Sequence, residues 1–423
     1  MVDARQKGKC TYQIQTLLWV GLLVFVLKLG SRRKIEAKFV TQQFVRHLAL
    51  LSSQELTKVP HNTTLAYLAR LLTPEDLDKL RYRVIKRLLR NKYLVKFRLF
   101  GYYLIALDGT GYLSFDKRHC RYCLRKRMKV KGRKKKKWRY YHPVVEAKLV
   151  TVNGLALSMA TEFIENPKLK VKRQDCELAA AYRLLGRLGK QFPQLKVCLL
   201  LDSLYVSEEI LNICEKYDWR YIIVFKEGCA PELYQEYQVL KKRCQDNYLA
   251  YNWEDGGENQ RYWWVTSLDY KFKGHHYVNF LECLVIKKKP KKGERKQSRW
   301  LWLTNLPITK ENCMILANEG GRLRWKTENE GFNIQKNGGY NLEHPYIEDW
   351  NGAKCFYLLL QIAHIINQLI EKGSLLTKEV RKALGSIREI AQRLLEELRY
   401  FFFGPGEFEQ LITRRIQIRF DTS

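Results

Sequence analysis

The chain has 423 residues, of which 46% are hydrophobic and 13% aromatic, and its formal net charge is +33. This composition excludes a disordered chain and allows one large core or two or three linked units. A globular protein this basic usually meets a polyanion such as DNA, RNA or an anionic membrane. Eleven scattered cysteines, an odd number without a signal peptide, favour reduced thiols in a cytoplasmic protein.

The N-terminal part is predicted to be helical from residue 12 to about 95. Its apolar run LLWVGLLVFVLKLG at 17–30 is interrupted by Lys28, whereas a membrane span needs about 20 apolar residues. We expect a buried core helix there, with an interfacial or spanning helix as the alternative. Helix starts are expected near Asn62 and at Thr73, and the amphipathic helix after Thr73 carries a basic face for phosphate or for solvent.

Two hydrophobic runs in the centre of the chain each end on an aspartate. LFGYYLIALD at 99–108 predicts a buried strand that delivers Asp108 to a Gly-Thr-Gly loop. LKVCLLLDS at 195–203 predicts a second buried strand, which ends at Asp202. Acids at strand ends of an open α/β sheet converge on the crevice where ligands bind, although such acids also cap loops.

A mixed α/β layer follows from the elements around these runs. PVVEAKLVTV and LALSMATEFI, joined by an Asn-Gly turn, predict a hairpin, and 174–192 predicts a helix. With a further helix and a strand over 220–225, the order is strand, strand, strand, helix, strand, helix, strand. Alternating aromatic segments then indicate a β-rich insertion over 230–305, and 350–403 is predicted to be helical.

The segment GGRLRWKTENEGFNIQKNGGYNLEH at 320–344 has helical periodicity, with polar groups where a buried helix would carry leucine or valine. Four side chains share one face: Arg324, Glu328, Phe332 and Gln335. Glu330 projects about 200° away from Glu328, so only one of the two can face a common site. Arg324 lies four residues before Glu328 and therefore on the same face of the helix, so Glu328 is the better candidate for the site. Trp325 and Phe332 are expected to pack the helix, with stacking of an aromatic ring on a base as the alternative.

Asp108, Asp202 and Glu328 together form a candidate divalent-metal site, separated along the chain by 94 and 126 residues. Hard oxygen ligands suit Mg²⁺, and three carboxylates can hold two ions roughly 4 Å apart. One ion would activate an attacking water or 3′-hydroxyl, and the other would stabilise the leaving oxygen. The positive charge of the chain would supply affinity for a phosphodiester substrate.

The amino-acid sequence of this helix resembles that of a known family. RWKTE resembles the signature of the DDE transposases of bacterial insertion sequences, and more closely that of the insertion-sequence-four-like group. In that group's pattern, Arg324 and Glu328 match the arginine and glutamate. Gly321 stands at the tyrosine position and Gln335 at the lysine position, with Lys336 one residue later. ALDGTGY and LLLDSLYVSEEIL are similar to the group's two acidic blocks, so the resemblance covers most of the chain.

The resemblance implies an RNase H-like fold of the retroviral integrase superfamily, with a β-rich insertion before the catalytic helix. It implies Mg²⁺- or Mn²⁺-dependent cleavage and joining of DNA by a homodimer bound to terminal inverted repeats and target DNA. Asp108, Asp202 and Glu328 would be the metal ligands, and Arg324 would contact DNA phosphate. We therefore expect a DNA-end-binding helical region, a first core part, a β-rich insertion, a final core helix and a C-terminal helical region, over 1–98, 99–228, 229–305, 306–345 and 346–423.

Three other functions stay open at this point. A nuclease of the same fold without strand transfer would share the metal chemistry. A decayed, non-catalytic copy would still bind DNA, although the intact acids argue against it. A membrane protein anchored by 17–30 is the third alternative.

Two further patterns concern binding. Residues 117–139 hold fourteen Lys or Arg and no acid, and we expect a solvated loop that contacts DNA through residues such as Lys134, Lys135 and Lys136. In the segment 320–344, Trp325 and Lys336 are also expected to bind DNA. The run 117–139 also contains HCRYC, which offers His119, Cys120 and Cys123, with His142 downstream. Such a set can bind Zn²⁺, but the second Cys-x-x-Cys or His pair of common zinc motifs is missing. A turn with two buried thiols is the alternative.

Overall fold

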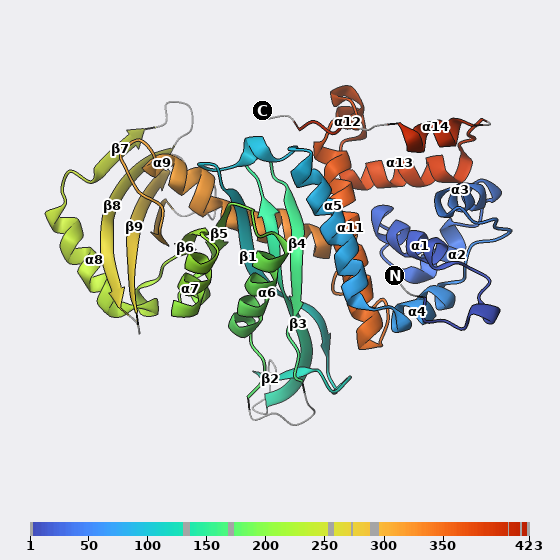
Figure 1. The fold of residues 1–423 in the computed structure, drawn as a ribbon, viewed down its shortest axis with the longest axis horizontal. Helices are drawn as coiled ribbons and strands as arrows, with labels where there is room; N and C mark the ends of the chain where they lie inside the picture. Colours follow the sequence, from blue (N-terminus) through green and yellow to red (C-terminus); the bar gives the residue numbers. More distant parts are fainter. Residues whose placement is uncertain are drawn as a thin grey trace.

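A mixed sheet of ten strands organises the chain, and helices pack around it (Figure 1). The computed structural model describes residues 3–129, 136–167, 173–252, 258–271, 274–287, 296–404, 406–414 and 417–420. The strands are β1 Tyr103–Phe115, β2 Leu124–Lys129, β3 Lys136–Val150, β4 Ala156–Phe163, β5 Val197–Leu201, β6 Arg220–Val224, β7 Tyr248–Asn252, β8 Glu258–Lys271, β9 His275–Lys287 and β10 Gln297–Thr304. Across the sheet the order is β2-β3-β1-β5-β6-β10-β9-β8-β7, and β4 also pairs with β3. The predicted α/β class is confirmed.

The helices lie before, between and after the strands in the chain. The α-helices are α1 Ile14–Val26, α2 Ile35–Lys38, α3 Gln42–Ser52, α4 Asn62–Leu71, α5 Pro74–Arg90, α6 Glu177–Gln191, α7 Glu208–Lys216, α8 Pro231–Arg243, α9 Cys313–Ile315, α10 Ile334–Asn337, α11 Trp350–Lys372, α12 Lys378–Leu384, α13 Ile387–Tyr400 and α14 Glu407–Thr413. Further helical turns are η1 Lys7–Lys9, η2 Arg32–Lys34, η3 Val95–Phe97, η4 Ser203–Tyr205, η5 Glu227–Cys229, η6 Leu316–Gly320, η7 Gly321–Trp325 and η8 Thr327–Asn333.

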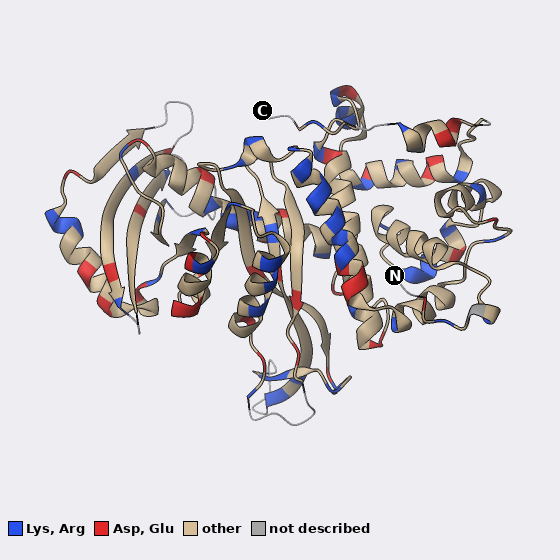
Figure 2. Ribbon diagram, viewed as in Figure 1, with Lys and Arg blue, Asp and Glu red and all other residues tan. Residues whose placement is uncertain are grey.

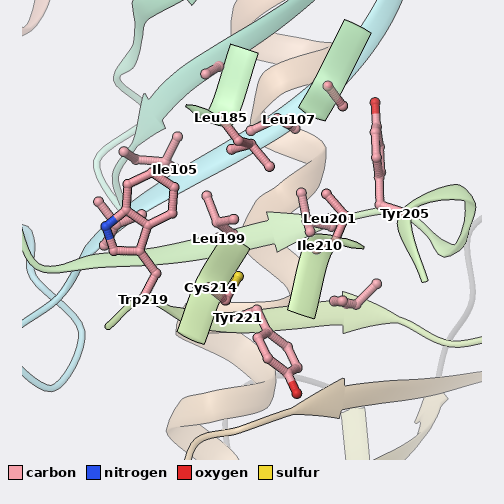
Figure 3. Close-up of a cluster of buried hydrophobic side chains, with 14 of the residues drawn as sticks. Ile105, Leu107, Leu185, Leu199, Leu201, Tyr205, Ile210, Cys214, Trp219 and Tyr221 are labelled. Atoms are coloured by element: carbon pink, nitrogen blue, oxygen red, sulfur yellow. The ribbon is translucent and has the colours of Figure 1, made fainter. Parts of the chain in front are cut away.

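The central strands follow the predicted order. β3 is antiparallel to both β1 and β4, whereas β5 is parallel to β1 and β6 is parallel to β5. Parallel neighbours need a crossover, which α6 and α7 supply. Their apolar faces close on the sheet in the cluster of Figure 3, which includes Ile105, Leu107, Leu185, Leu199, Leu201, Ile210 and Cys214.

The aromatic-rich segments expected over 230–305 are present as β7–β10, but they continue the central sheet, because β10 pairs antiparallel with β6. Sequence reasoning missed α8, which precedes them. Pro231 at its first turn is a helix-start signal, and the side chains of Leu233 and Tyr237 are buried under it against the sheet.

The helical ends of the chain pack together around α11, which contacts α1, α4, α5 and β4 (Figure 1). The prediction of a buried helix within 17–30 is confirmed, since Leu17, Val20 and Val24 of α1 are fully enclosed. Within the described part of the chain, α11 is the one helix long and apolar enough to cross a membrane, and 83% of its apolar window is buried inside the protein.

The basic run 117–139 was expected to be a loop. This expectation is confirmed for 117–123 and is wrong for 124–129 and 136–139, which are strands. β2 pairs antiparallel with the first half of β3, from Leu124 opposite Tyr141 to Lys129 opposite Lys136. The two strands form a ribbon that extends beyond the sheet and carries many Lys and Arg (Figures 1 and 2). We call it the basic ribbon. Lys136 is exposed at its tip, and Lys134 and Lys135 lie outside the described residues.

Candidate functional site

The register of β1 and β5 places Asp108 and Asp202 at corresponding positions along two neighbouring strands. The parallel pairing sets Ala106 opposite Leu200, an offset of 94 residues, and the same offset relates Asp108 to Asp202. Adjacent strands lie about 4.8 Å apart, so the two carboxylates start from neighbouring backbone positions. Backbone amides hold both: Gly109 N–H donates to Asp108 Oδ1 at 3.0 Å, and the amide after Asp202 donates to its Oδ1 at 2.6 Å.

The predicted Gly-Thr-Gly loop after Asp108 is wrong. β1 runs on to Phe115, because its pairing with β3 continues from Ile105 opposite Leu149 to Phe115 opposite Tyr140. Asp108 is therefore an interior residue of a long strand, two positions past the last residue paired with β5. Its carboxylate stands where the parallel part of the sheet ends.

Glu328 approaches this place from η8, which packs against β1, β3 and β4. A regular α-helix was expected here, but the segment alternates tight turns over Gly321–Trp325 with wide π-helical turns over Thr327–Asn333. Such wide turns are frequent at functional sites, where they displace a side chain from regular spacing. Half of the Glu328 side chain, 51%, is exposed.

Arg324 links the two acids. Its guanidinium lies 2.9 Å from Glu328 Oε1 through Nη2 and 3.9 Å from Asp108 Oδ2 through Nη1. Glu330 points elsewhere: it is paired with Lys326 at 3.4 Å, beside the turn at Gly154, whose positive φ of 83° suits glycine. Glu328, rather than Glu330, is thus the glutamate that shares an arginine with Asp108.

A fourth carboxylate, that of Glu177, was missed by sequence reasoning. It belongs to the first turn of α6 and accepts a hydrogen bond of 2.8 Å from the hydroxyl of Tyr205, which follows Asp202 in η4. The carboxylate lies so close to Gly109 that a Cβ there would sit 2.3 Å from Glu177 Oε2. Glycine at this position of β1 therefore lets a second acid approach next to Asp108. The available signal was an acid at a helix start, which usually indicates capping alone.

The close approach of these carboxylates shifts the pKa values of groups in the site. Burial raises the pKa of Asp108 to about 7, and the charges of Glu328 and Glu177 add to the rise, whereas Arg324 and the Gly109 amide oppose it. Burial and the adjacent Glu177 likewise raise the pKa of Tyr205. The site holds more negative charge than its single bridging arginine balances.

A buried ionic network supports β3 beneath the site. Glu146, opposite Asp108 on β3, is fully buried and lies 3.8 Å from Arg81 Nη1 and 3.5 Å from Lys148 Nζ. Ser158 also donates to it at 2.6 Å. Lys148 sits over the ring of Phe332, with its Nζ 5.0 Å from the centroid, and burial lowers its pKa. Asp78 also pairs with Arg81, so the layer beneath the η8 segment holds two cations and two carboxylates.

The other predicted DNA-binding residues differ in exposure. Trp325 was expected to pack, but 51% of it is exposed, with the ammonium of Lys326 over its ring, so this expectation is wrong; Phe332 is buried as expected. Lys336 pairs with Glu343 at 2.8 Å. Gln335, which replaces the pattern's lysine, is fully buried and donates to Gln361 at 2.8 Å.

The carboxylates line one edge of the sheet without meeting at a point. Among the described residues, one group of three His, Cys, Asp or Glu side chains has all its ligand atoms within 4.8 Å of one another, and it is Cys120, Cys123 and His142. Of the zinc ligands predicted from the sequence, His119 lies outside that group. The acids offer hard oxygen donors and uncompensated charge, which is the donor chemistry that Mg²⁺ requires.

No family model matches the chain, and no curated protein is significantly similar to it.

Proposed function

We propose that the chain is a DDE-type transposase, which cleaves DNA at the ends of an insertion sequence and joins those ends to target DNA with Mg²⁺ or Mn²⁺. The observation that carries the proposal is the shared offset of 94 residues, which brings Asp108 beside Asp202, while Arg324 joins Asp108 to Glu328. Two distant acids on adjacent parallel strands and a third on a crossing helix are what the resemblance requires.

The topology adds support. Three antiparallel strands, β4, β3 and β1, are followed across the sheet by the parallel strands β5 and β6, each reached through a helix. This order agrees with the RNase H-like core that the resemblance implies. β7–β10 enter the chain between β6 and Glu328, where the resemblance expects its β-rich insertion.

Asp108, Asp202 and Glu328 would hold the metal ions. Bound there, divalent ions would supply activation of the attacking oxygen and stabilisation of the leaving oxygen at phosphorus. Arg324 lies between two of the acids in the free protein. Once those acids bind metal, its planar guanidinium would be available to bind a DNA phosphate in bidentate fashion. The exposed ring of Trp325, next to it in sequence, is suited to stacking on an unpaired base.

Affinity for DNA would come from the basic surfaces. The basic ribbon is one, and α5 is another, since its exposed side chains include Arg83, Arg87 and Arg90 in a helical stripe (Figure 2). Each phosphate neutralised by such a side chain releases a counterion, so binding should weaken steeply with salt. Joining two ends would require two copies of the chain on the DNA.

The test is cleavage and strand transfer on labelled DNA that carries the element's own ends, with Mg²⁺ or Mn²⁺. We expect the wild type to cut and join, while Asp202→Ala and Glu328→Ala bind DNA without cutting. Glu330→Ala is the matched control, two residues from Glu328 but turned away from Asp108, and it should keep cutting.

Three results would overturn the proposal or its assignments. Cutting without joined product would favour a nuclease of the same fold. Salt-sensitive binding without cutting in either metal would favour a decayed DNA-binding protein. Loss of cutting in Glu330→Ala but not in Glu328→Ala would reverse the choice of glutamate.

A further inference from the structure

A cluster of two thiols and one imidazole lies at the base of the basic ribbon, away from the carboxylates. Cys120 Sγ is 3.7 Å from Cys123 Sγ and 3.5 Å from His142 Nε2, and Cys123 Sγ is 3.1 Å from the same nitrogen. Tetrahedral zinc, with Zn–S bonds of about 2.3 Å and Zn–N bonds of about 2.0–2.1 Å, separates two sulfurs by about 3.8 Å and sulfur from nitrogen by about 3.5 Å. Two of the three observed separations match these values, and the third is shorter.

The backbone around the thiols is arranged to keep them together. The amide of Cys123 donates to the carbonyl of Cys120 at 3.4 Å, which closes a tight turn, and the amide of Cys120 donates back to Cys123 Sγ at 3.3 Å. Asn166 fixes the turn from outside, through its side-chain amide to the Cys123 carbonyl at 2.9 Å and its backbone amide to the Tyr122 carbonyl at 3.1 Å. An amide aimed at a sulfur favours a thiolate, the form that binds metal.

The histidine is equally constrained. His142 lies on β3, is fully buried, and stacks on Trp350 with ring centroids 3.9 Å apart, at the first residue of α11. Its Nε2 faces the two sulfurs, and its Nδ1 has no hydrogen-bond partner among the described residues. Ring stacking, rather than a hydrogen bond, therefore aims the imidazole.

We propose that Cys120, Cys123 and His142 bind one Zn²⁺ ion, which holds the root of the basic ribbon against the sheet and α11. Two soft thiolates and an imidazole are a donor set that selects zinc. The sulfurs are too far apart for the bond of about 2.05 Å in a disulfide. The fourth coordination position is left to solvent or to His119, whose half-buried ring stacks on Phe115 beside the cluster and whose Nε2 contacts the Glu348 carbonyl.

The position of the cluster indicates a structural role. His142 stands opposite Leu113, five residues beyond Asp108 along β1, or roughly 17 Å at the rise of a strand. The zinc ligands come from the loop before β2 and from β3, so the ion would join the two strands of the basic ribbon where they leave the sheet. It takes no part in the carboxylate site.

The test begins with the zinc content of the full-length chain, purified without chelator and measured by inductively coupled plasma mass spectrometry. We expect about one zinc per chain in the wild type, and next to none in Cys123→Ser and in His142→Ala. Cys176→Ser is the matched control, because Cys176 is an exposed thiol outside the cluster, and it should keep its zinc. Zinc is measured without DNA, so the result is independent of the cleavage test.

Measurements on the wild type keep the proposal testable if a variant does not fold. Removal of zinc by a strong chelator should speed tryptic cleavage within the basic ribbon, and added zinc should restore protection. Co²⁺ added to the stripped chain should give thiolate-to-metal charge-transfer bands and the d–d bands of a tetrahedral site. A reduced, folded wild type that holds no zinc and takes up no cobalt would overturn the proposal, as would equal zinc content in the cluster variants.

Discussion

Replacing Asp108 with asparagine should stabilise the free protein at pH 8, and should stabilise it by less than half as much at pH 5. Burial raises the pKa of this carboxyl to about 7, against Arg324 and with the help of Glu328 and Glu177. The unfolded chain loses the same proton near pH 4. Between about pH 4 and 7 the folded protein therefore binds one proton more than the unfolded chain, so the free energy of unfolding falls as the pH rises through this window.

The size of the effect follows from the shift. A rise from 3.8 to about 7 corresponds to roughly 4 kcal/mol at pH 8, and this is an upper limit because 18% of the Asp108 side chain stays exposed. Asparagine has nearly the same shape and no charge, so it avoids the cost. With an entropy of unfolding of about 2.1 cal/mol/K per residue, 423 residues give about 0.9 kcal/mol/K. The melting temperature at pH 8 should then rise by up to about 4 °C if the chain unfolds as one unit.

Thermal melts followed by tryptophan fluorescence from pH 5 to 8 would measure this gain. Asp116→Asn is the matched control: it lies at the end of the same strand run, is exposed, and has its pKa lowered by Arg139 and Lys137, so its removal should give no gain at pH 8. Mg²⁺ should raise the melting temperature of the wild type at pH 8 more than that of Asp108→Asn. A gain that is equal at pH 5 and pH 8, or absent at pH 8, would refute the assignment of a buried, uncompensated charge.

Other expected outcomes test the supporting layer and the DNA surface. Glu146→Gln should lower the free energy of unfolding by about 3–5 kcal/mol in urea denaturation, because buried Lys148 would lose the carboxylate it pairs with, while Arg81 would keep its pair with Asp78. Lys129→Ala, in the basic ribbon, should reduce the slope of log affinity against log salt by about 0.9 in anisotropy titrations with duplex DNA, and an unchanged slope would exclude a phosphate contact. Trp325→Ala should weaken binding to single-stranded ends by about 1–3 kcal/mol with little change in melting temperature, since the ring is half exposed.

Local hydrophobic patterns were sufficient for β5, which leads to Asp202, and for α6. Both segments are strongly patterned, and the structure has them where the periodicity predicts. The spacing of 94 residues between Asp108 and Asp202 can be counted in the sequence, but the sequence does not show that the two residues lie on neighbouring strands. It became informative only when the register of β1 and β5 showed the same offset.

The remaining parts of the site depend on contacts between distant segments. Gly-Thr-Gly is a sequence typical of loops, yet its pairing with β3 holds it in a strand. Glycine is required at position 109 because the Glu177 carboxylate, from another element, occupies the space that a side chain would need. The pairing of Glu146 with Arg81 is equally invisible in sequence, since 65 residues separate them. The wide helical turns around Glu328 occur where η8 packs against three strands. The periodicity of the local sequence contains no information about this packing.

β1 and β3 connect the carboxylate site to the basic ribbon and set their relative position. Asp108 and Glu146 face each other on these strands, and farther along the same pair Leu113 stands opposite His142, where the ribbon departs. The two strands stay paired on both sides of one irregularity between Gly111 and Leu113, so neighbouring hydrogen bonds would have to break for one end to shift relative to the other. DNA held by the ribbon would then be held at a fixed distance from Asp108, provided that the ribbon's root is rigid. The root is where the zinc ligands lie, so loss of zinc should impair the position of bound DNA more than the affinity for it.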